Sequence, residues 1–247
     1  MALFEARDLH LRFGDRVVLE NVSLAFEAGQ LCGIMGPNGA GKTTCFNVLT
    51  GRYKPDRGQV LWQGADITGR TPQEIARLGI ARSFQLMNLF DEFTVCENIA
   101  IALPATRRRG HNMIAQAYAD SALVDEAHVI LGKVGLADRA DDAAKSLPYG
   151  ARRALEIGVA LACRPKLLFL DEPTAGLGSD GRARLAELIG QLKGQLGIVI
   201  IEHDMEFLFS LADAISVIHW GQVIARGAPA DLKANPWVEA SNLGRLN

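Results

Sequence analysis

The sequence has little of what secreted, membrane-spanning or nucleic-acid-binding proteins require. Its 247 residues hold only four cysteines, too scattered for a metal site and too few for a disulfide framework: Cys32, Cys45, Cys96 and Cys163. The 26 Lys and Arg residues do not outnumber the 28 Asp and Glu residues, so no overall positive charge is available to attract nucleic acid. The longest apolar runs, near residues 157–163 and 196–201, are far shorter than the ~20 residues of a membrane-spanning helix. We therefore expect one large or two small globular domains from a reducing compartment, without a membrane span.

Alternating apolar residues near the start predict an antiparallel hairpin with one buried face. They flank a turn at Gly14-Asp15 and comprise Leu9, Leu11 and Phe13 before it and Val22, Leu24 and Phe26 after it. Val60 and Trp62 indicate a further strand. Residues 71–74, Thr-Pro-Gln-Glu, then have the form of a capping box with proline at the first helical position.

Short apolar strands and amphipathic helices alternate in much of the remaining chain. Strands are expected at residues 31–35, 167–170 and 198–201. The helix before the last strand carries apolar residues on one face: Leu185, Leu188, Ile189, Leu192 and Leu196. This pattern is typical of an α/β fold with a mainly parallel sheet covered on both faces.

A helical insert interrupts the alternation. From about residue 86 to residue 134 the sequence is alanine-rich, has almost no strand signal and contains a second capping box at residues 94–97, Thr-Val-Cys-Glu. A basic run at residues 107–109 could touch lipid headgroups, but such runs are more typical of a solvated loop.

Residues 36–43 read Gly-Pro-Asn-Gly-Ala-Gly-Lys-Thr and match the complete phosphate-loop pattern. They lie between an expected strand and an expected helix, which is the context that this pattern requires. The glycines let backbone N–H groups close around phosphates, and the helix N-terminus adds a favourable dipole. Lys42 can reach the β and γ oxygens of a nucleoside triphosphate, and the Thr43 hydroxyl can ligate Mg²⁺. A glycine-rich turn without function would not require Lys-Thr at the helix start.

Two acids end the strand at residues 167–170, at the sheet edge where open α/β sheets bind ligands. Asp171 would hold Mg²⁺ through its water shell, and Glu172 would act as general base toward the attacking water. Without the phosphate loop, the two acids could equally be a helix cap. His203 follows the strand at 198–201 and should reach the same edge, while Gln85, at the start of the insert, could orient water or contact Mg²⁺.

These residues, in this order, resemble the motifs of ATP-binding cassette (ABC) proteins over essentially the whole chain. Residues 36–44 resemble the Walker A motif, Gln85 the Q-loop, residues 146–150 (Ser-Leu-Pro-Tyr-Gly) the signature, residues 170–173 (Leu-Asp-Glu-Pro) the Walker B motif, and His203 the switch histidine. The resemblance implies a single nucleotide-binding domain, 1–247. It comprises a RecA-like core with an antiparallel β subdomain at 1–85 and 160–247, and a helical subdomain bearing the signature at 86–159.

The resemblance also implies a role for each candidate residue. ATP would be bound by Phe13 (stacking on adenine), Gly36, Pro37, Asn38, Gly39, Ala40, Gly41, Lys42, Thr43, Thr44, Tyr149 and Gly150. Mg²⁺ would be held by Thr43, Gln85 and Asp171, and catalysis would use Glu172, His203 and Gln85. Phe13 could equally be a residue of the strand core. Each ATP would lie between one subunit's phosphate loop and the other subunit's signature helix in a head-to-tail dimer.

Further segments narrow the resemblance to the larger ATPase of branched-chain amino-acid importers and their urea, amide and aromatic-acid relatives. They include residues 81–85 (Ala-Arg-Ser-Phe-Gln), 202–205 (Glu-His-Asp-Met) and 235–238 (Asn-Pro-Trp-Val). The implied partners are a second ATPase subunit, two permease subunits and, indirectly, a periplasmic or extracellular solute-binding protein, with no nucleic acid. The implied location is the cytoplasmic face of the inner membrane, and the permease contact is expected at residues 86–94, with Phe90 as a contact residue.

Two departures from the family pattern lie where the partner's nucleotide is expected. The signature has Pro148 and ends in Ala151 instead of glutamine, and Gly178 replaces an acid or asparagine. We therefore expect a heterodimer with one weaker site. A soluble ABC ATPase of DNA repair or translation would need a coiled-coil insertion or two fused cassettes, and a P-loop kinase or GTPase would lack the signature and His203.

Overall fold

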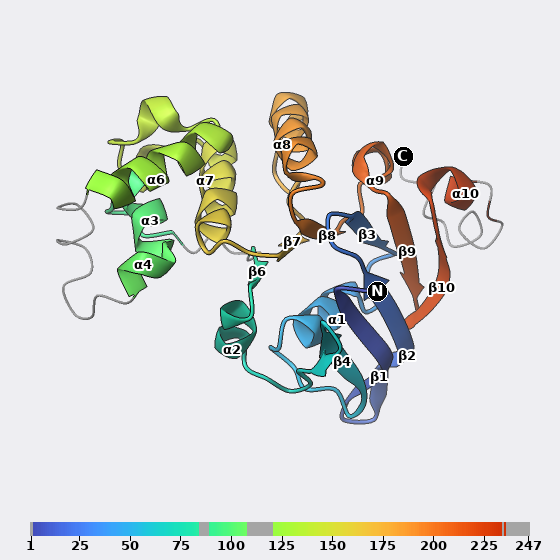
Figure 1. Ribbon diagram of the computed structural model, residues 1–247. Helices are drawn as coiled ribbons and strands as arrows, with labels where there is room; N and C mark the ends of the chain where they lie inside the picture. The colour runs from blue at the N-terminus through green and yellow to red at the C-terminus, as the bar shows by residue number, and fades with distance from the viewer. Residues whose placement is uncertain (1, 84–88, 108–120, 234, 236–247) are drawn as a thin grey trace. The chain divides into compact units, whose positions relative to one another are not determined.

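The computed structural model describes residues 2–83, 89–107, 121–233 and 235 (Figure 1). None of the helices in these ranges is both long and apolar enough to span a bilayer. The described chain forms two compact units. The core unit lies within Met1–Ile80, Lys166–Pro173 and Ile189–Asn247, and the helical unit lies within Ala81–Pro165 and Thr174–Leu188.

The core unit begins with a four-stranded antiparallel sheet of order β2-β1-β4-β5. Its strands are β1 (Phe4–Phe13), β2 (Arg16–Phe26), β4 (Arg57–Trp62) and β5 (Ala65–Asp66). The expected hairpin is therefore confirmed. Aromatic rings join this sheet to the rest of the core, since Phe4 meets Phe169 edge-on at 5.5 Å between ring centroids and Phe169 meets Phe46 at 5.8 Å.

A six-stranded sheet follows, of order β10-β9-β3-β8-β7-β6. Its parallel strands are β9 (Ala214–His219), β3 (Leu31–Met35), β8 (Gly197–Ile201) and β7 (Leu167–Asp171); β10 (Gln222–Gly227) pairs antiparallel with β9, and β6 is Ile80–Arg82. Every residue of β3, β7 and β8 is buried, as continuous apolar strands of a covered parallel sheet should be. The expected α/β fold with a mainly parallel sheet is confirmed.

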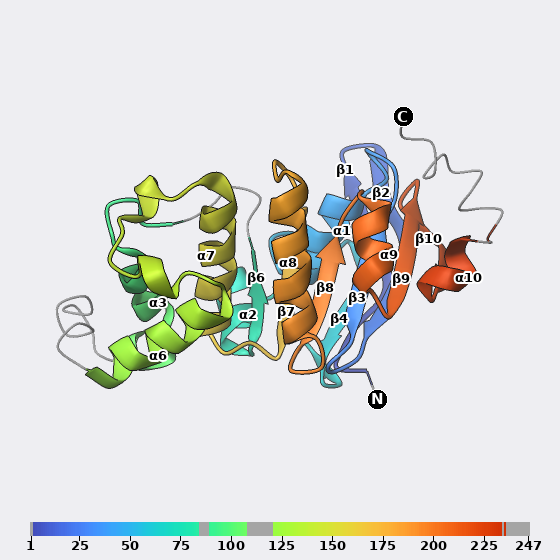
Figure 2. The same cartoon turned by 90° about the horizontal axis from the view of Figure 1, so that it is seen from above.

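Short helices accompany the sheets of the core unit: α1 (Lys42–Leu49), α2 (Pro72–Arg77), α9 (Met205–Leu211) and α10 (Pro229–Lys233). Helix α9 packs on β3, and α10 packs against β9 and β10 (Figure 2). The capping box of α2 is present, with Thr71 and Glu74 satisfying each other's backbone N–H groups.

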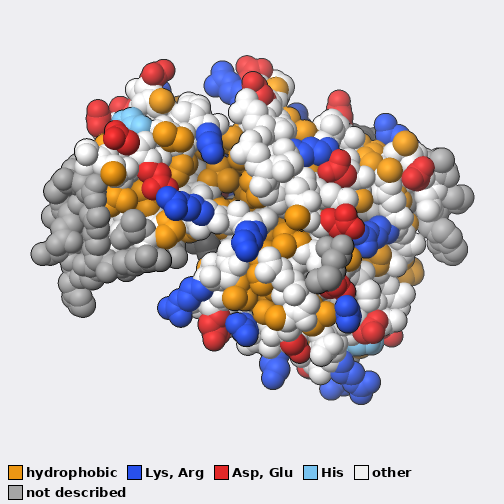
Figure 3. All heavy atoms as spheres, viewed as in Figure 1, with side chains coloured by type: hydrophobic (Ala, Val, Ile, Leu, Met, Phe, Trp, Pro, Cys, Tyr) orange, Lys and Arg blue, Asp and Glu red, His pale blue; other side chains and the backbone are white. Residues whose placement is uncertain are grey.

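The helical unit contains α3 (Val95–Ala102), α4 (Pro104–Arg107), α6 (Ser121–Lys133) and α7 (Tyr149–Ala162), of which α3, α6 and α7 pack together. The 3₁₀ turns η2 (Ala137–Arg139) and η3 (Ala144–Ser146) precede α7, and α8 (Ser179–Leu192) begins in this unit and ends in the core unit. The second capping box, Thr94 with Glu97, opens α3 as expected. On the face that Figure 3 shows, acidic and basic side chains are interspersed, in agreement with the near-zero net charge of −2.

Two sequence expectations are wrong in detail. Helix α8 ends at Leu192, because Gly194 adopts a left-handed conformation (φ 84°) that stops the helix, so Leu196 is buried outside it. The side chain of Phe13 is 49% exposed, so Phe13 is not a strand-core residue. Register shifts in the pairing of β1 with β2, near Leu9 and Leu11, break the two-residue alternation before it reaches Phe13.

Candidate functional site

The phosphate-loop residues connect β3 to α1, and close packing of the backbone requires glycine at two positions. A Cβ atom at residue 36 would lie 2.0 Å from the Ile218 carbonyl oxygen, where no side chain fits. Gly41 has a φ of 100°, and a Cβ atom there would lie 2.8 Å from the Val18 carbonyl oxygen. Both contacts are to backbone atoms of neighbouring strands, so the loop is held in one shape by the sheet around it.

Lys42 opens α1 and turns back into the loop. Its Nζ donates hydrogen bonds to the carbonyl oxygens of Gly36 (2.8 Å) and Pro37 (2.9 Å), and the residue is 6% exposed. Burial lowers the pKa of this ammonium, while the carboxylates of Glu172, Asp171 and Glu202 act in the opposite direction. A cation therefore lies inside a backbone cradle, and no side chain caps the N-terminus of α1. This combination suits a phosphate group.

Asp171 and Glu172 lie at the carboxyl end of β7. Asp171 is 2% exposed. Glu172 has left-handed backbone geometry (φ 44°), which is strained for a non-glycine residue, and its N–H donates to the Ile201 carbonyl oxygen at 2.8 Å. Strained residues of this kind gather at functional sites because the surrounding structure holds a side chain in a required direction.

His203 follows β8 and lies beside Glu172, as its position after the strand predicted. Its Nδ1 is 3.8 Å from Glu172 Oε1 and 3.7 Å from Glu202 Oε2. The Glu202 side chain is fully buried and accepts the backbone N–H groups of His203 (3.0 Å) and Asp204 (3.3 Å). Glu202 thus fixes the backbone that carries the histidine.

The sequence analysis included Glu202 only within residues 202–205 and assigned it no role. The available signal was an acid directly after a buried apolar strand, the same signal that identified Asp171.

The donor set fits a magnesium ion that is shared with phosphate oxygens. Thr43 is exposed in the first turn of α1, and Asp171 is a carboxylate at the end of β7 in the same sheet as β3. Within the described ranges no group of three or more His, Cys, Asp or Glu side chains could hold a metal ion. One hydroxyl and one carboxylate are what Mg²⁺ uses when water and substrate phosphates complete its octahedron.

The remaining candidates lie apart from this cluster in the chain. Phe13 ends β1, with its ring edge-on to Tyr53 at 5.4 Å between centroids, so part of the ring is open to a ligand. Tyr149 and Gly150 open α7 in the helical unit, where no side chain caps the helix. The Tyr149 hydroxyl donates to the Ala175 carbonyl oxygen at 3.1 Å. Gln85, Arg108, Arg109 and residues 236–238 lie outside the described residues.

A family model described as ABC transporter matches residues 19–175. The high-affinity branched-chain amino acid transport ATP-binding protein LivG of Salmonella typhimurium is 38% identical to this chain over 249 residues, which cover 98% of both proteins. The protein BraF of Pseudomonas aeruginosa, whose name describes the same role, is 37% identical over 251 residues, again 98% of both.

Solved structures agree with these sequence matches. A nucleotide-free ATP-binding cassette from an ABC transporter superposes with a TM-score of 0.86 at 30% identity, covering 99% of this chain and all of that one. An ATP-binding cassette of an ABC transporter in its ADP conformation gives the same TM-score, identity and coverage.

Proposed function

The chain belongs to the ABC transporter family, and from this membership we propose that it hydrolyses ATP to drive uptake of branched-chain amino acids or related small solutes. The whole-length similarity to LivG and BraF supports the solute class, because the names of those proteins describe branched-chain amino acid transport. The observation that supports the catalytic part is that Lys42, inside the glycine loop, interacts electrostatically with the carboxylates of Asp171 and Glu172.

In this proposal the loop binds the triphosphate of ATP through its backbone N–H groups, and Lys42 moves its hydrogen bonds from loop carbonyls to the β and γ oxygens. Thr43 and Asp171 would hold Mg²⁺, which neutralises charge on those oxygens when it is bound. Glu172 accepts a proton from water as the water oxygen bonds to the γ-phosphorus and the bond to ADP breaks. His203 lies 3.8 Å from Glu172 and orients that carboxylate.

A second ATPase subunit would complete each site by presenting its signature helix to the bound ATP. The open N-terminus of α7, with Tyr149 and Gly150, is the surface that this chain would offer in return. Pro148, Ala151 and Gly178 provide fewer polar side chains there than the family pattern does. We therefore favour a heterodimer whose two sites differ.

The permease contact is proposed at residues 86–94 of the helical subdomain (86–159), with Phe90 as its centre; residues 86–88 lie outside the described residues. Phe90 is 55% exposed and stacks on Phe93 at 5.2 Å between centroids. The buried Asn98 side chain fixes the backbone beneath, since it accepts the Phe90 N–H at 2.9 Å and donates to the carbonyl oxygens of Phe90 and Thr94. A rigid loop that presents an exposed aromatic ring suits docking into an apolar socket.

The proposed assembly places this chain at the cytoplasmic face of the inner membrane, bound to two permease subunits that receive solute from a binding protein. The test is leucine uptake by proteoliposomes that contain the chain with its permease subunits, second ATPase and binding protein. We expect uptake that requires internal ATP and stops when Lys42→Ala replaces the wild-type chain. Uptake of urea or an aromatic acid in place of leucine would contradict the assignment to branched-chain amino acids, and the absence of ATP hydrolysis would overturn the whole proposal.

A further inference from the structure

Residues 90–94, hereafter the docking segment, are hydrogen-bonded to residues 143–145, which lead into α7. The Phe93 carbonyl oxygen accepts the Ala144 N–H at 2.9 Å, and the Asp91 carbonyl oxygen accepts the Lys145 N–H at 3.1 Å. Thr94 and Ala143 form an antiparallel bridge. The docking segment therefore moves together with residues 143–145, but these hydrogen bonds stop before α7 begins.

A non-helical joint separates residues 143–145 from α7. Leu147 (φ −70°, ψ 139°) and Pro148 (φ −57°, ψ 154°) are extended, so α7 does not continue back through this joint, and its other connection to the docking segment is its packing against α3. Tyr149 and Gly150 lie immediately beyond the joint.

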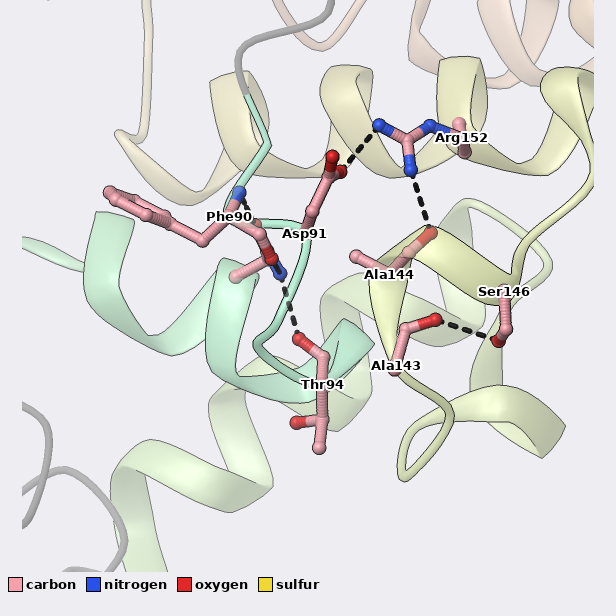
Figure 4. A network of polar contacts seen from close by, with 8 residues as sticks. Phe90, Asp91, Thr94, Ala143, Ala144, Ser146 and Arg152 are labelled. Carbon is pink, nitrogen blue, oxygen red and sulfur yellow. Dashed lines mark hydrogen bonds and ion pairs between the residues drawn. The ribbon is translucent and has the colours of Figure 1, made fainter.

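Arg152 spans this joint with a two-pronged contact, which Figure 4 shows from close by. Its Nη2 donates to Asp91 Oδ1 at 2.6 Å, and its Nη1 donates to the Ala144 carbonyl oxygen at 3.1 Å. Its own N–H donates to the Pro148 carbonyl oxygen at 3.0 Å, so the side chain projects from the first turn of α7. One planar guanidinium thus holds the docking segment, residue 144 and the helix start together, which a lysine could not do.

We propose that Arg152 is a positioning residue that, through Asp91, fastens the docking segment to the first turn of α7. Displacement of Phe90 by a permease then reaches Tyr149 and Gly150 without being absorbed at Leu147 and Pro148. This inference rests on the proposed function, because it assumes that the permease binds the docking segment.

The chain contains a matched control pair. Lys145 Nζ and Glu92 Oε2 are also 2.6 Å apart and also join the docking segment to the stretch before α7. Lys145 precedes Leu147 and Pro148, so this pair does not connect the docking segment to α7. It is also more exposed, with side chains 56% and 75% accessible, against 19% for Arg152 and 55% for Asp91. Charge changes in the Asp91–Arg152 pair, which spans the joint, can therefore be compared with the same changes in the Glu92–Lys145 pair, which does not.

The first experiment needs no transported solute. Hydrogen exchange of the isolated chain should show faster exchange in the peptide that covers residues 149–152 when Asp91→Asn is introduced. Glu92→Gln should leave this peptide unchanged. Equal protection in the wild type and Asp91→Asn would overturn the proposal even if the importer works as proposed.

The second experiment measures leucine transported per ATP hydrolysed in the reconstituted importer. Asp91→Arg and Arg152→Asp should each lower this ratio about tenfold, with the KM for ATP changed less than about twofold, as a coupling energy of ordinary size predicts. The double variant Asp91→Arg/Arg152→Asp should recover most of the ratio, because it restores opposite charges across the joint. Arg152→Lys, which keeps the charge and the fold, should recover little of it.

Three results would overturn the proposal: a wild-type ratio in either single variant, an equal loss in Glu92→Lys and Lys145→Glu, or no recovery in a double variant with the wild-type melting temperature. A wild-type importer that transports no leucine would instead contradict the assignment of the proposed function to branched-chain amino acids, and the exchange experiment alone would then test the role of Arg152.

Discussion

Among single residues, the site depends on one buried cation, Lys42, in a loop where Gly36 and Gly41 leave no space for a Cβ atom. Among the described residues Lys42 donates to the backbone carbonyl oxygens of Gly36 and Pro37, and three carboxylates partly oppose the effect of burial on its pKa. When ATP binds, the Lys42 ammonium can therefore donate to phosphate oxygens, which are stronger hydrogen-bond acceptors than the two carbonyl oxygens.

Lys42→Ala should therefore weaken ATP binding while the chain stays folded. Loss of hydrogen bonds to a charged group costs about 1.5–3 kcal/mol, which corresponds to roughly 10- to 150-fold in affinity. Direct titration with ATP checks this, and Lys54→Ala, which removes an exposed lysine from the same unit, is the control. ATP affinity equal to that of the control would show that Lys42 does not contact the phosphates.

Glu172 allows a test of backbone strain that is separate from its chemistry. Alanine is normally more stabilising than glycine, by about 0.5–1 kcal/mol in regular structure. At the left-handed φ of 44° this order should reverse, with Glu172→Gly more stable than Glu172→Ala by about 1 kcal/mol. Urea denaturation of the two variants measures the difference. The usual order, with alanine ahead, would mean that residue 172 is not held in this conformation in solution.

At the scale of elements, local patterns predicted the phosphate loop and the strand ends because each depends on residues close together in the sequence. The loop pattern, the apolar strand before it and the acids after β7 are all short-range signals. The same holds for the two capping boxes, which need only four residues each.

Features that depend on tertiary packing could not be predicted in this way. Arg152 and Asp91 are 61 positions apart, and no local sequence pattern pairs them. The exposure of Phe13 follows from irregular strand pairing, which no alternation pattern reveals. The hairpin of β9 and β10 was also not predicted from the sequence. The Gly221 N–H in its turn donates to the Ala40 carbonyl oxygen of the phosphate loop.

A further prediction concerns the exposed Phe90 of the docking segment. Phe90→Asp should lower solute uptake by the reconstituted importer about tenfold or more, because an unpaired charge in an apolar socket costs several kcal/mol. The isolated chain should fold normally, since Phe90 is already 55% exposed. Val129→Asp changes an equally exposed apolar residue of α6 and is the control. Full uptake by Phe90→Asp would place the permease contact elsewhere.

At the scale of the whole molecule, the proposed heterodimer has two unequal sites. This chain's sequence contains Lys42, Gln85, Asp171, Glu172 and His203 for its own phosphate loop, and the structure describes all of them except Gln85. The surface that it would offer to the partner's site carries Pro148, Ala151 and Gly178. We expect most hydrolysis at the site built on this chain's loop, with the other site binding ATP through the backbone at the start of α7.

The prediction is checked by replacing the general base on each side of the assembled importer in turn. Glu172→Gln in this chain should reduce ATP hydrolysis more than the matching change in the partner. A larger loss from the partner's variant would rule out the proposed asymmetry.

In the proposed mechanism Glu172 is the base that activates water for ATP hydrolysis at this chain's phosphate loop. The most direct measurement is the steady-state ATPase rate of the assembled importer that carries Glu172→Gln, together with its ATP affinity. The amide keeps the shape of the side chain but cannot accept a proton, so hydrolysis should fall on the order of a hundredfold or more while ATP binding is kept. A loss of less than about threefold, with ATP bound normally, would contradict the assignment of Glu172.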